Sequence, residues 1–151
     1  MESLWKRTAD MPEFPALEGE RKTDVLIIGG GLAGVLCAWK LKKAGADCLL
    51  LEADRIGGQT TGNTTAKITS QHGLIYQRLL KEFDPEKARL YYEANEEALS
   101  TYRTLCRGLD CDFEEKDAYV YSRKDRKKLD RELAALERLG FAAQFAAELP
   151  L

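Results

Sequence analysis

The sequence lacks the features that mark several classes of protein. No apolar run in its 151 residues approaches the roughly 20 residues that a membrane-spanning helix requires. The net charge of −2 gives no electrostatic basis for binding nucleic acid or an acidic membrane surface. Residues 1–15 contain no apolar stretch of the kind that secretion signals carry. We therefore expect a cytoplasmic protein with no membrane span and no nucleic-acid partner.

Cysteine and histidine are scarce as well. The chain has four cysteines and one histidine, His72. Cys106 and Cys111 are close in sequence, but no second pair and no clustered histidine completes a metal site. We expect no metal, and four reduced, structural cysteines, with Cys37 and Cys48 in buried elements. His72 has no partner residues that would make it a catalytic base.

A strand, a glycine turn, a helix and a second strand follow one another early in the chain. "DVLII" (24–28) is a β-branched run of the kind found in strands that are covered on both faces. "LAGVLCAWKLKKAG" (32–45) has apolar residues near helical spacing, and "DCLLLE" (47–52) reads as a second buried strand. This order predicts a parallel βαβ unit.

The later part of the chain gives coarser signals. A helix is predicted to begin with Asp84 as its N-cap and Pro85 at its first position. A short pair of strands is predicted around residues 111–122. An amphipathic helix follows within residues 125–140, and we expect its charged side chains to be solvated.

The turn between the first strand and the helix has a glycine pattern. "GGGLAG" places Gly29, Gly31 and Gly34 in the spacing G-x-G-x-x-G. In a strand–turn–helix context, the first glycine permits the sharp turn, the second lets a pyrophosphate approach, and the third lets the helix pack closely. The amides at the helix start favour the negative charge of phosphates.

Glu52, at the end of the second strand, would accept hydrogen bonds from a ribose diol and repel a 2′-phosphate. The pattern predicts dinucleotide binding and leaves the dinucleotide open.

The segment "RIGGQTTGNTT" (55–65) indicates which kind of dinucleotide is bound. Its glycines and hydroxyls suit a loop that folds back over the pyrophosphate, with short donors at Thr60, Thr61, Asn63 and Thr64. A simple nicotinamide dehydrogenase has no need of such a loop. The alternative reading is a polar surface loop.

At these residues the chain resembles the FAD-dependent oxidoreductases of the D-amino-acid-oxidase type, which include glycine and sarcosine oxidases and γ-glutamylputrescine oxidase. The resemblance lies in "DVLIIGGGLAG" and "EADRIGGQTTGN". The continuation "TTGNTTAKITSQHG" is similar to a bacterial subgroup that often carries a C-terminal Rieske domain. The resemblance implies FAD as cofactor, and a Rieske [2Fe-2S] cluster in a C-terminal region outside this chain.

The resemblance also implies which residues contact the cofactor. The first glycine loop would wrap the pyrophosphate, Glu52 would hold the ribose, and residues 53–55 would lie beside the adenine. Residues 60–64 would close on the diphosphate and 65–67 would run toward the flavin ring. The expected contacts are Gly29, Gly31, Ala33, Gly34, Glu52, Ala53, Arg55, Thr60, Thr61, Gly62, Asn63, Thr64, Thr65, Ala66 and Lys67. For Lys67, a plain surface lysine is an equal alternative.

By the same resemblance, the protein would transfer a hydride from a C–H bond next to nitrogen in a small amine or amino acid to flavin N5. No catalytic side chain can be assigned. The alternative is a non-catalytic NAD-binding Rossmann module that acts as a sensor or scaffold. Substrate, electron acceptor and oligomeric state stay open.

These readings combine into an α/β fold: a Rossmann-like FAD-binding βαβ unit with added helices and the start of a mixed α+β substrate domain. We predict a lead-in over residues 1–22, the FAD-binding portion over 23–110, and the beginning of the substrate domain over 111–151. Because family members are longer, we expect the chain to be an N-terminal part that is inactive alone.

Overall fold

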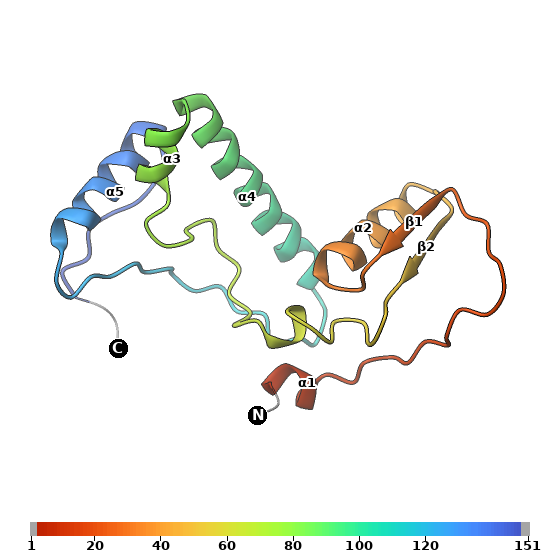
Figure 1. Ribbon diagram of the computed structural model, residues 1–151. Helices are drawn as coiled ribbons and strands as arrows, with labels where there is room; N and C mark the ends of the chain where they lie inside the picture. Colours follow the sequence, from red (N-terminus) through yellow and green to blue (C-terminus); the bar gives the residue numbers. More distant parts are fainter. Residues whose placement is uncertain (1–2, 149–151) are drawn as a thin grey trace. The chain divides into compact units, whose positions relative to one another are not determined.

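The computed structural model describes residues 3–148, which form two compact units with the boundary between Lys67 and Ile68. Each unit has its own arrangement of elements (Figure 1). The predicted domain boundaries after residues 22 and 110 stay predictions. No helix in the described part of the chain is both long and apolar enough to cross a membrane.

The first unit contains the predicted βαβ element. Strands β1 (Val25–Ile28) and β2 (Cys48–Leu51) pair in parallel, and α2 (Leu32–Lys43) connects them. The helix packs along one face of this two-stranded sheet (Figure 1). It ends where Gly45, at φ +78°, donates its N–H to the Lys42 carbonyl oxygen at 3.0 Å. A left-handed glycine at this position is a common helix terminator.

The sheet is covered on one face only, which corrects the expectation of two covered faces. Ile27 faces α2, because a Cβ on Gly34 would lie 3.4 Å from the Ile27 Cγ2 atom. The alternate side chains of β1, Leu26 and Ile28, are 51% and 83% exposed. The reason is that the first unit, as described, has no second layer on that side of the strands. Cys37, expected to be buried, is exposed on α2.

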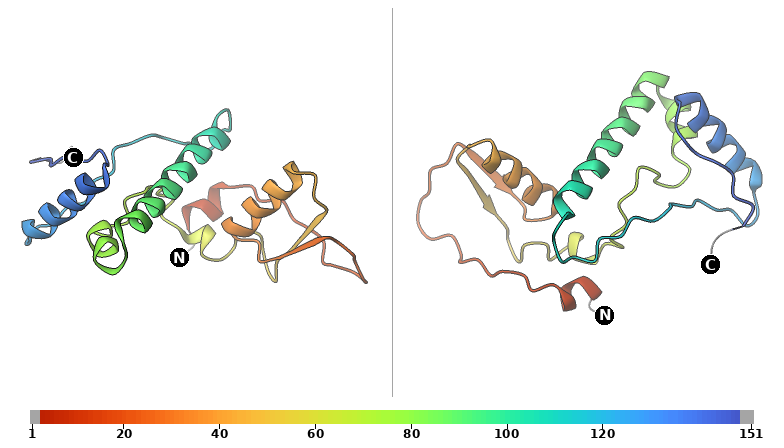
Figure 2. Two further views of the ribbon diagram at one scale, coloured as in Figure 1. Left: turned by 90° about the horizontal axis from the view of Figure 1, so that it is seen from above. Right: turned by 180° about the vertical axis from the view of Figure 1, so that it is seen from behind.

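The lead-in carries a short helix that the sequence does not signal. Helix α1 (Leu4–Thr8) begins at Ser3, whose side chain accepts the Lys6 N–H. It contacts the 3₁₀ turn η1 (Thr61–Asn63), and Figure 2 shows the two side by side. A helix this short is not stable by its own propensity, so this contact supports it.

The second unit is built from three helices, α3 (Tyr76–Glu82), α4 (Pro85–Cys106) and α5 (Arg126–Leu139). They pack on one another (Figure 2), and a small apolar core lies between them. The buried side chains of that core are Tyr76, Leu79, Ala88, Ala135, Leu136 and Leu139. The predicted start of α4 is confirmed, since Asp84 accepts the Lys87 N–H at 2.8 Å and Pro85 opens the helix.

The predicted strand pair around residues 111–122 is wrong, because these residues form no strand. Their large side chains are exposed, with Phe113 at 38%, Tyr119 at 43% and Tyr121 at 68%. An isolated two-stranded hairpin is marginal in water unless it joins further strands or packs on a helix. Within residues 111–148, the described part of the predicted substrate domain, the structure shows the helix α5 and no strand.

One charge of α5 is buried, contrary to the expectation of a solvated charged face. Glu132 is 3% exposed. Its carboxylate accepts the backbone N–H groups of Tyr76 at 2.8 Å and Gln77 at 2.9 Å, and the side-chain amide of Gln71 at 3.0 Å. The first N–H groups of a helix have no partner within the helix. Glu132 thus caps α3 from a neighbouring helix and ties the two together.

We predict that Glu132→Ala lowers the free energy of unfolding by about 2–3 kcal/mol, because buried donors at the start of α3 lose a charged acceptor. Urea unfolding followed by far-ultraviolet circular dichroism measures the change. Glu137→Ala, at an exposed position of the same helix, is the matched control. Equal stability of the two variants would contradict this role of Glu132.

Candidate functional site

The first glycine loop turns the chain from β1 into α2 with little space for side chains. Gly29 has φ +105°, and its N–H donates to the Leu51 carbonyl oxygen at 2.8 Å, which extends the parallel pairing by one bond. A Cβ on Gly34 would overlap the carbonyl oxygen of Gly29. Gly31 is the N-cap of α2 with extended backbone, and its carbonyl oxygen accepts the Val35 N–H at 3.0 Å. Gly29 thus makes the sharp turn, and Gly34 allows the close helix packing, as the glycine spacing predicts.

Gly30, an unspecified position of the G-x-G-x-x-G pattern, is one of the residues that the sequence did not predict as part of the site. It is buried, and a Cβ there would overlap Ile56 and come within 3.0 Å of the Glu52 Cβ atom. Its N–H donates to Glu52, and its carbonyl oxygen accepts the Gly57 N–H at 2.8 Å. The available signal was the run of three consecutive glycines, of which the pattern uses two.

Glu52 follows β2 and reaches across to the first glycine loop. Its Oε2 atom accepts the Gly30 N–H at 2.6 Å, and its Oε1 atom accepts the Asp54 N–H at 3.2 Å. These bonds, the Gly30 bond foremost, lower the pKa of Glu52, so the group is ionised at neutral pH. Each carboxylate oxygen has a further lone pair, and the group can therefore accept additional hydroxyl donors.

The second glycine loop, residues 57–64, folds back onto the first. Besides the bond from Gly57 to Gly30, the Thr61 hydroxyl oxygen accepts the Leu32 N–H at 2.9 Å, at the start of α2. Asn63 donates its side-chain amide to the Gln59 carbonyl oxygen at 2.8 Å. Thr61 keeps its own hydroxyl proton available for donation. The two loops are thus joined by two hydrogen bonds, one at Gly30 after β1 and one at Leu32 at the start of α2.

A cavity of about 190 Å³ lies between the two loops. Its lining residues come from the first loop, from the end of β2 and from the second loop: Gly31, Glu52, Arg55, Gly57, Gly58, Gln59, Thr60 and Thr61. A helix N-terminus, hydroxyl groups and an arginine provide donors there, and Glu52 provides an acidic acceptor. This donor set suits a ligand that carries both a phosphate and a sugar diol.

Several of the predicted contact residues lie outside this lining. Gly29 and Gly34 shape the turn behind it, while Ala33 and Ala53 are exposed next to it. Thr64 uses its hydroxyl oxygen to accept the Ala66 N–H at 3.3 Å. The remaining residues that do not line the cavity are Gly62, Asn63, Thr65, Ala66 and Lys67. Gln59, Gly57 and Gly58 line it without having been predicted.

Outside this cavity, the described residues include one histidine and no cluster that could hold a metal ion. His72 lies in the second unit, where its Nε2 atom is 3.3 Å from the side-chain oxygen of Asn95. No group of three or more histidine, cysteine or acidic side chains that could hold a metal ion occurs in the described part of the chain.

Comparison with known proteins gives a family match. The model of the FAD dependent oxidoreductase family (DAO) matches residues 24–149, which include both glycine loops. No solved structure matches the chain significantly.

The chain is also similar to several named proteins. It is 38% identical over 99% of its length to a Bacillus subtilis protein named as a Rieske 2Fe-2S iron–sulfur protein, YhfW. It is 28% identical over 82% of its length to γ-glutamylputrescine oxidoreductase of Escherichia coli, and 31% identical over 52% to an L-glutamate oxidase precursor of Streptomyces viridosporus. The chain spans only 30%, 28% and 15% of these three relatives.

We predict that Gly34→Ala destabilises the protein by about 3 kcal/mol, because the new Cβ would overlap backbone that has no freedom to move away. Thermal unfolding measures this loss. Gly31→Ala is the matched control, since its Cβ would meet only the Thr61 hydroxyl at 3.4 Å. If both variants unfold at the wild-type temperature, the close packing of α2 on the first glycine loop is not a constraint.

The lowered pKa of Glu52 also predicts a pH dependence. A carboxyl group with a lower pKa in the folded than in the unfolded state stabilises the fold above its unfolded pKa, and this contribution disappears as the pH falls through the folded pKa. The stability advantage of the wild type over Glu52→Gln should therefore shrink between about pH 6 and about pH 3. Urea midpoints across this range test it, with Asp54→Asn as a control for the loss of one charge. A constant difference would contradict the bonds to Gly30 and Asp54.

Proposed function

The chain belongs to the FAD dependent oxidoreductase family, and from this premise we propose that it forms the FAD-binding part of an enzyme that oxidises a small amine or amino acid. The observation that carries the proposal is the closure of the second glycine loop onto the first, with Glu52 bonded to Gly30 between them. A module that binds only a nicotinamide dinucleotide has no need of the second loop.

The residues present fit this cofactor. Gly30 and Gly34 leave no room for a side chain, and Gly31 offers bare backbone to the cavity, as a pyrophosphate contact requires. Thr60, Thr61 and the start of α2 would hold the diphosphate. An ionised Glu52 would accept the hydroxyls of the adenosine ribose.

The remaining predicted contacts belong to the proposal as well. Arg55 and Ala53 would lie beside the adenine, and Gly62, Asn63 and Thr64 would support the diphosphate side. Residues 65–67 would lead toward the flavin. The cavity of about 190 Å³ is smaller than the roughly 300 Å³ of small ligand pockets, so it would take only a part of the cofactor, the diphosphate with the adjoining ribose.

Bound FAD would supply the redox chemistry by accepting a hydride from a substrate C–H bond next to nitrogen. The part of this chain is to hold and orient the adenosine diphosphate, to exclude water from it, and to keep an acidic side chain on its ribose. The names of relatives that act on γ-glutamylputrescine and L-glutamate support an amine or amino-acid substrate. The similarity to a protein named for a Rieske cluster supports such a cluster elsewhere in the whole protein.

The absorbance spectrum of the purified protein, together with mass spectrometry of the released cofactor, tests the proposal. We expect flavin absorbance and one FAD per chain. A colourless protein that binds NAD and not FAD would contradict the proposal and favour the non-catalytic NAD-binding module.

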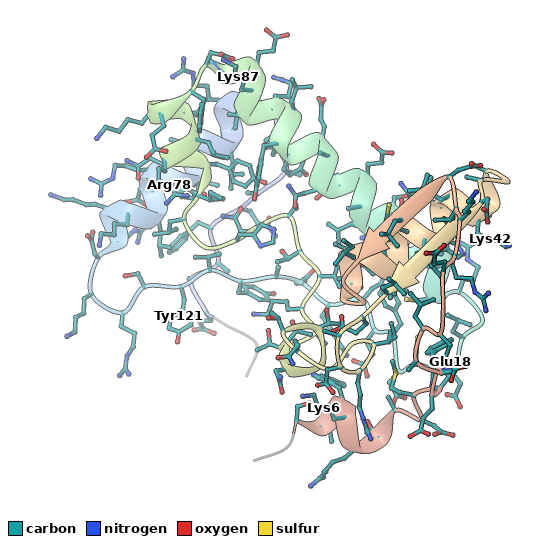
Figure 3. The ribbon with its side chains drawn as sticks, turned by 45° about the vertical axis from the view of Figure 1, so that its right-hand side comes forward. Lys6, Glu18, Lys42, Arg78, Lys87 and Tyr121 are labelled. Atoms are coloured by element: carbon teal, nitrogen blue, oxygen red, sulfur yellow. The ribbon has the colours of Figure 1, made fainter. Side chains whose placement is uncertain are left out.

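We predict that Gly31→Ala weakens FAD binding at least about tenfold while the fold is retained, because its Cβ would occupy the space that the pyrophosphate needs. Flavin fluorescence during titration of the cofactor-free protein measures the affinity. Lys42→Ala, exposed near the other end of α2, is the matched control (Figure 3). Wild-type affinity in Gly31→Ala would place the diphosphate elsewhere.

A further inference from the structure

Side chains of the N-terminal segment, residues 3–11, bond to the backbone of the second glycine loop. The Trp5 indole N–H donates to the Thr64 carbonyl oxygen at 2.8 Å. The Ser3 hydroxyl donates to the Gly62 carbonyl oxygen. Both bonds join residues 59 positions apart in sequence, so they fix the path of one segment against the other. Because their acceptors are carbonyl oxygens, they hold the conformation of the loop itself.

Packing contacts accompany these bonds at both ends of the loop. A Cβ on Gly62 would lie 2.8 Å from the Lys6 Cε atom, and a Cβ on Gly57 would lie 3.5 Å from the Met11 Cε atom. Lys6 lies on the side of α1 that faces η1 (Figure 3). The N-terminal segment therefore covers the loop from Gly57 to Thr64.

The loop that receives these contacts is the one that closes the cavity. Gly57 bonds to Gly30, and Thr61 accepts the N–H of Leu32, so the loop has the glycine turn on one side and the N-terminal segment on the other. Five residues of the loop line the cavity: Gly57, Gly58, Gln59, Thr60 and Thr61. A loop of this kind, rich in glycine and with no fully buried residue, is expected to open locally unless both sides are held.

We propose that residues 3–11 act as a clasp that keeps the second glycine loop closed over the cofactor diphosphate, with Trp5 as the principal positioning residue. This inference rests on the proposed FAD binding and deepens it. A loop that is closed before the cofactor arrives raises the fraction of binding-competent protein and therefore the apparent affinity. The clasp itself makes no contact with the reacting atoms.

Trp5→Phe is the variant that isolates this role. It keeps an aromatic ring on α1 and removes the N–H that bonds to Thr64, together with the smaller ring of the indole. Loss of one such bond is expected to speed FAD release about 3- to 10-fold. The chain contains one other tryptophan, Trp39, which lies on α2 with the Lys43 ammonium 4.6 Å from its ring centroid. Trp39→Phe is the matched control.

Two measurements are made on wild type, Trp5→Phe and Trp39→Phe: the rate of FAD release, and hydrogen exchange of the peptide covering residues 57–64 in the cofactor-free protein. Exchange reports on the loop itself and does not depend on activity. We expect Trp5→Phe alone to show faster exchange in this peptide and faster FAD release, with unchanged exchange in α4.

Each other outcome overturns the clasp. If Trp5→Phe leaves both loop exchange and FAD release at wild-type values, the N-terminal segment does not hold the loop. If it speeds exchange throughout the protein, Trp5 has a general structural role. Failure of the wild type itself to bind FAD refutes the proposed function, which separates that failure from a failure of the clasp alone.

Discussion

The arrangement of the first unit depends on two hydrogen bonds to the backbone of Gly30. One comes from the Gly57 N–H and fixes the second glycine loop, and the other goes to the Glu52 carboxylate and fixes the end of β2. Both are possible only because Gly30 has no side chain, since a Cβ there would overlap Ile56. The cavity, the acidic group beside it and the bond from Leu32 to Thr61 follow from this one close approach. Backbone geometry, more than any particular side chain, thus shapes the site.

Stability is distributed differently in the two units. The fully buried apolar side chains of the described residues all belong to the helical second unit, where Tyr76 and Leu139 are 0% exposed. The first unit instead leaves Leu26 and Ile28 exposed and relies on backbone bonds and glycine contacts. A unit of this kind gains much from a ligand that binds only the folded state, because such binding adds directly to its free energy of unfolding. Cofactor binding and folding of this unit are therefore expected to be linked.

The sequence predicted the features that depend on residues close together in the chain. The βαβ order, the glycine turn and the Asp84–Pro85 start of α4 depend on neighbours in the chain, and all are present. The features that the sequence did not predict depend on contacts between residues far apart in the chain. Gly30 occupies a variable position of the pattern, and its importance comes from Ile56 and Gly57. In the sequence, Glu132 cannot be told from the exposed charges of an amphipathic helix. Its burial depends on α3, whose first N–H groups it accepts. Helix α1 is stabilised by its contact with η1. The predicted strands around residues 111–122 do not form, because the described part of the second unit offers no further strand with which they could pair.

The most direct test of this site is nuclear magnetic resonance of the protein with isotope-labelled glycine during titration with adenosine diphosphate, which carries the diphosphate and ribose that the cavity would hold. The 12 glycines report on both loops and on the second unit at once. We expect the amide signals of Gly30, Gly31 and Gly57 to shift together along one saturation curve, while those of Gly108 and Gly140 stay in place. Shifts that omit either glycine loop, or that spread equally over both units, would contradict this expectation.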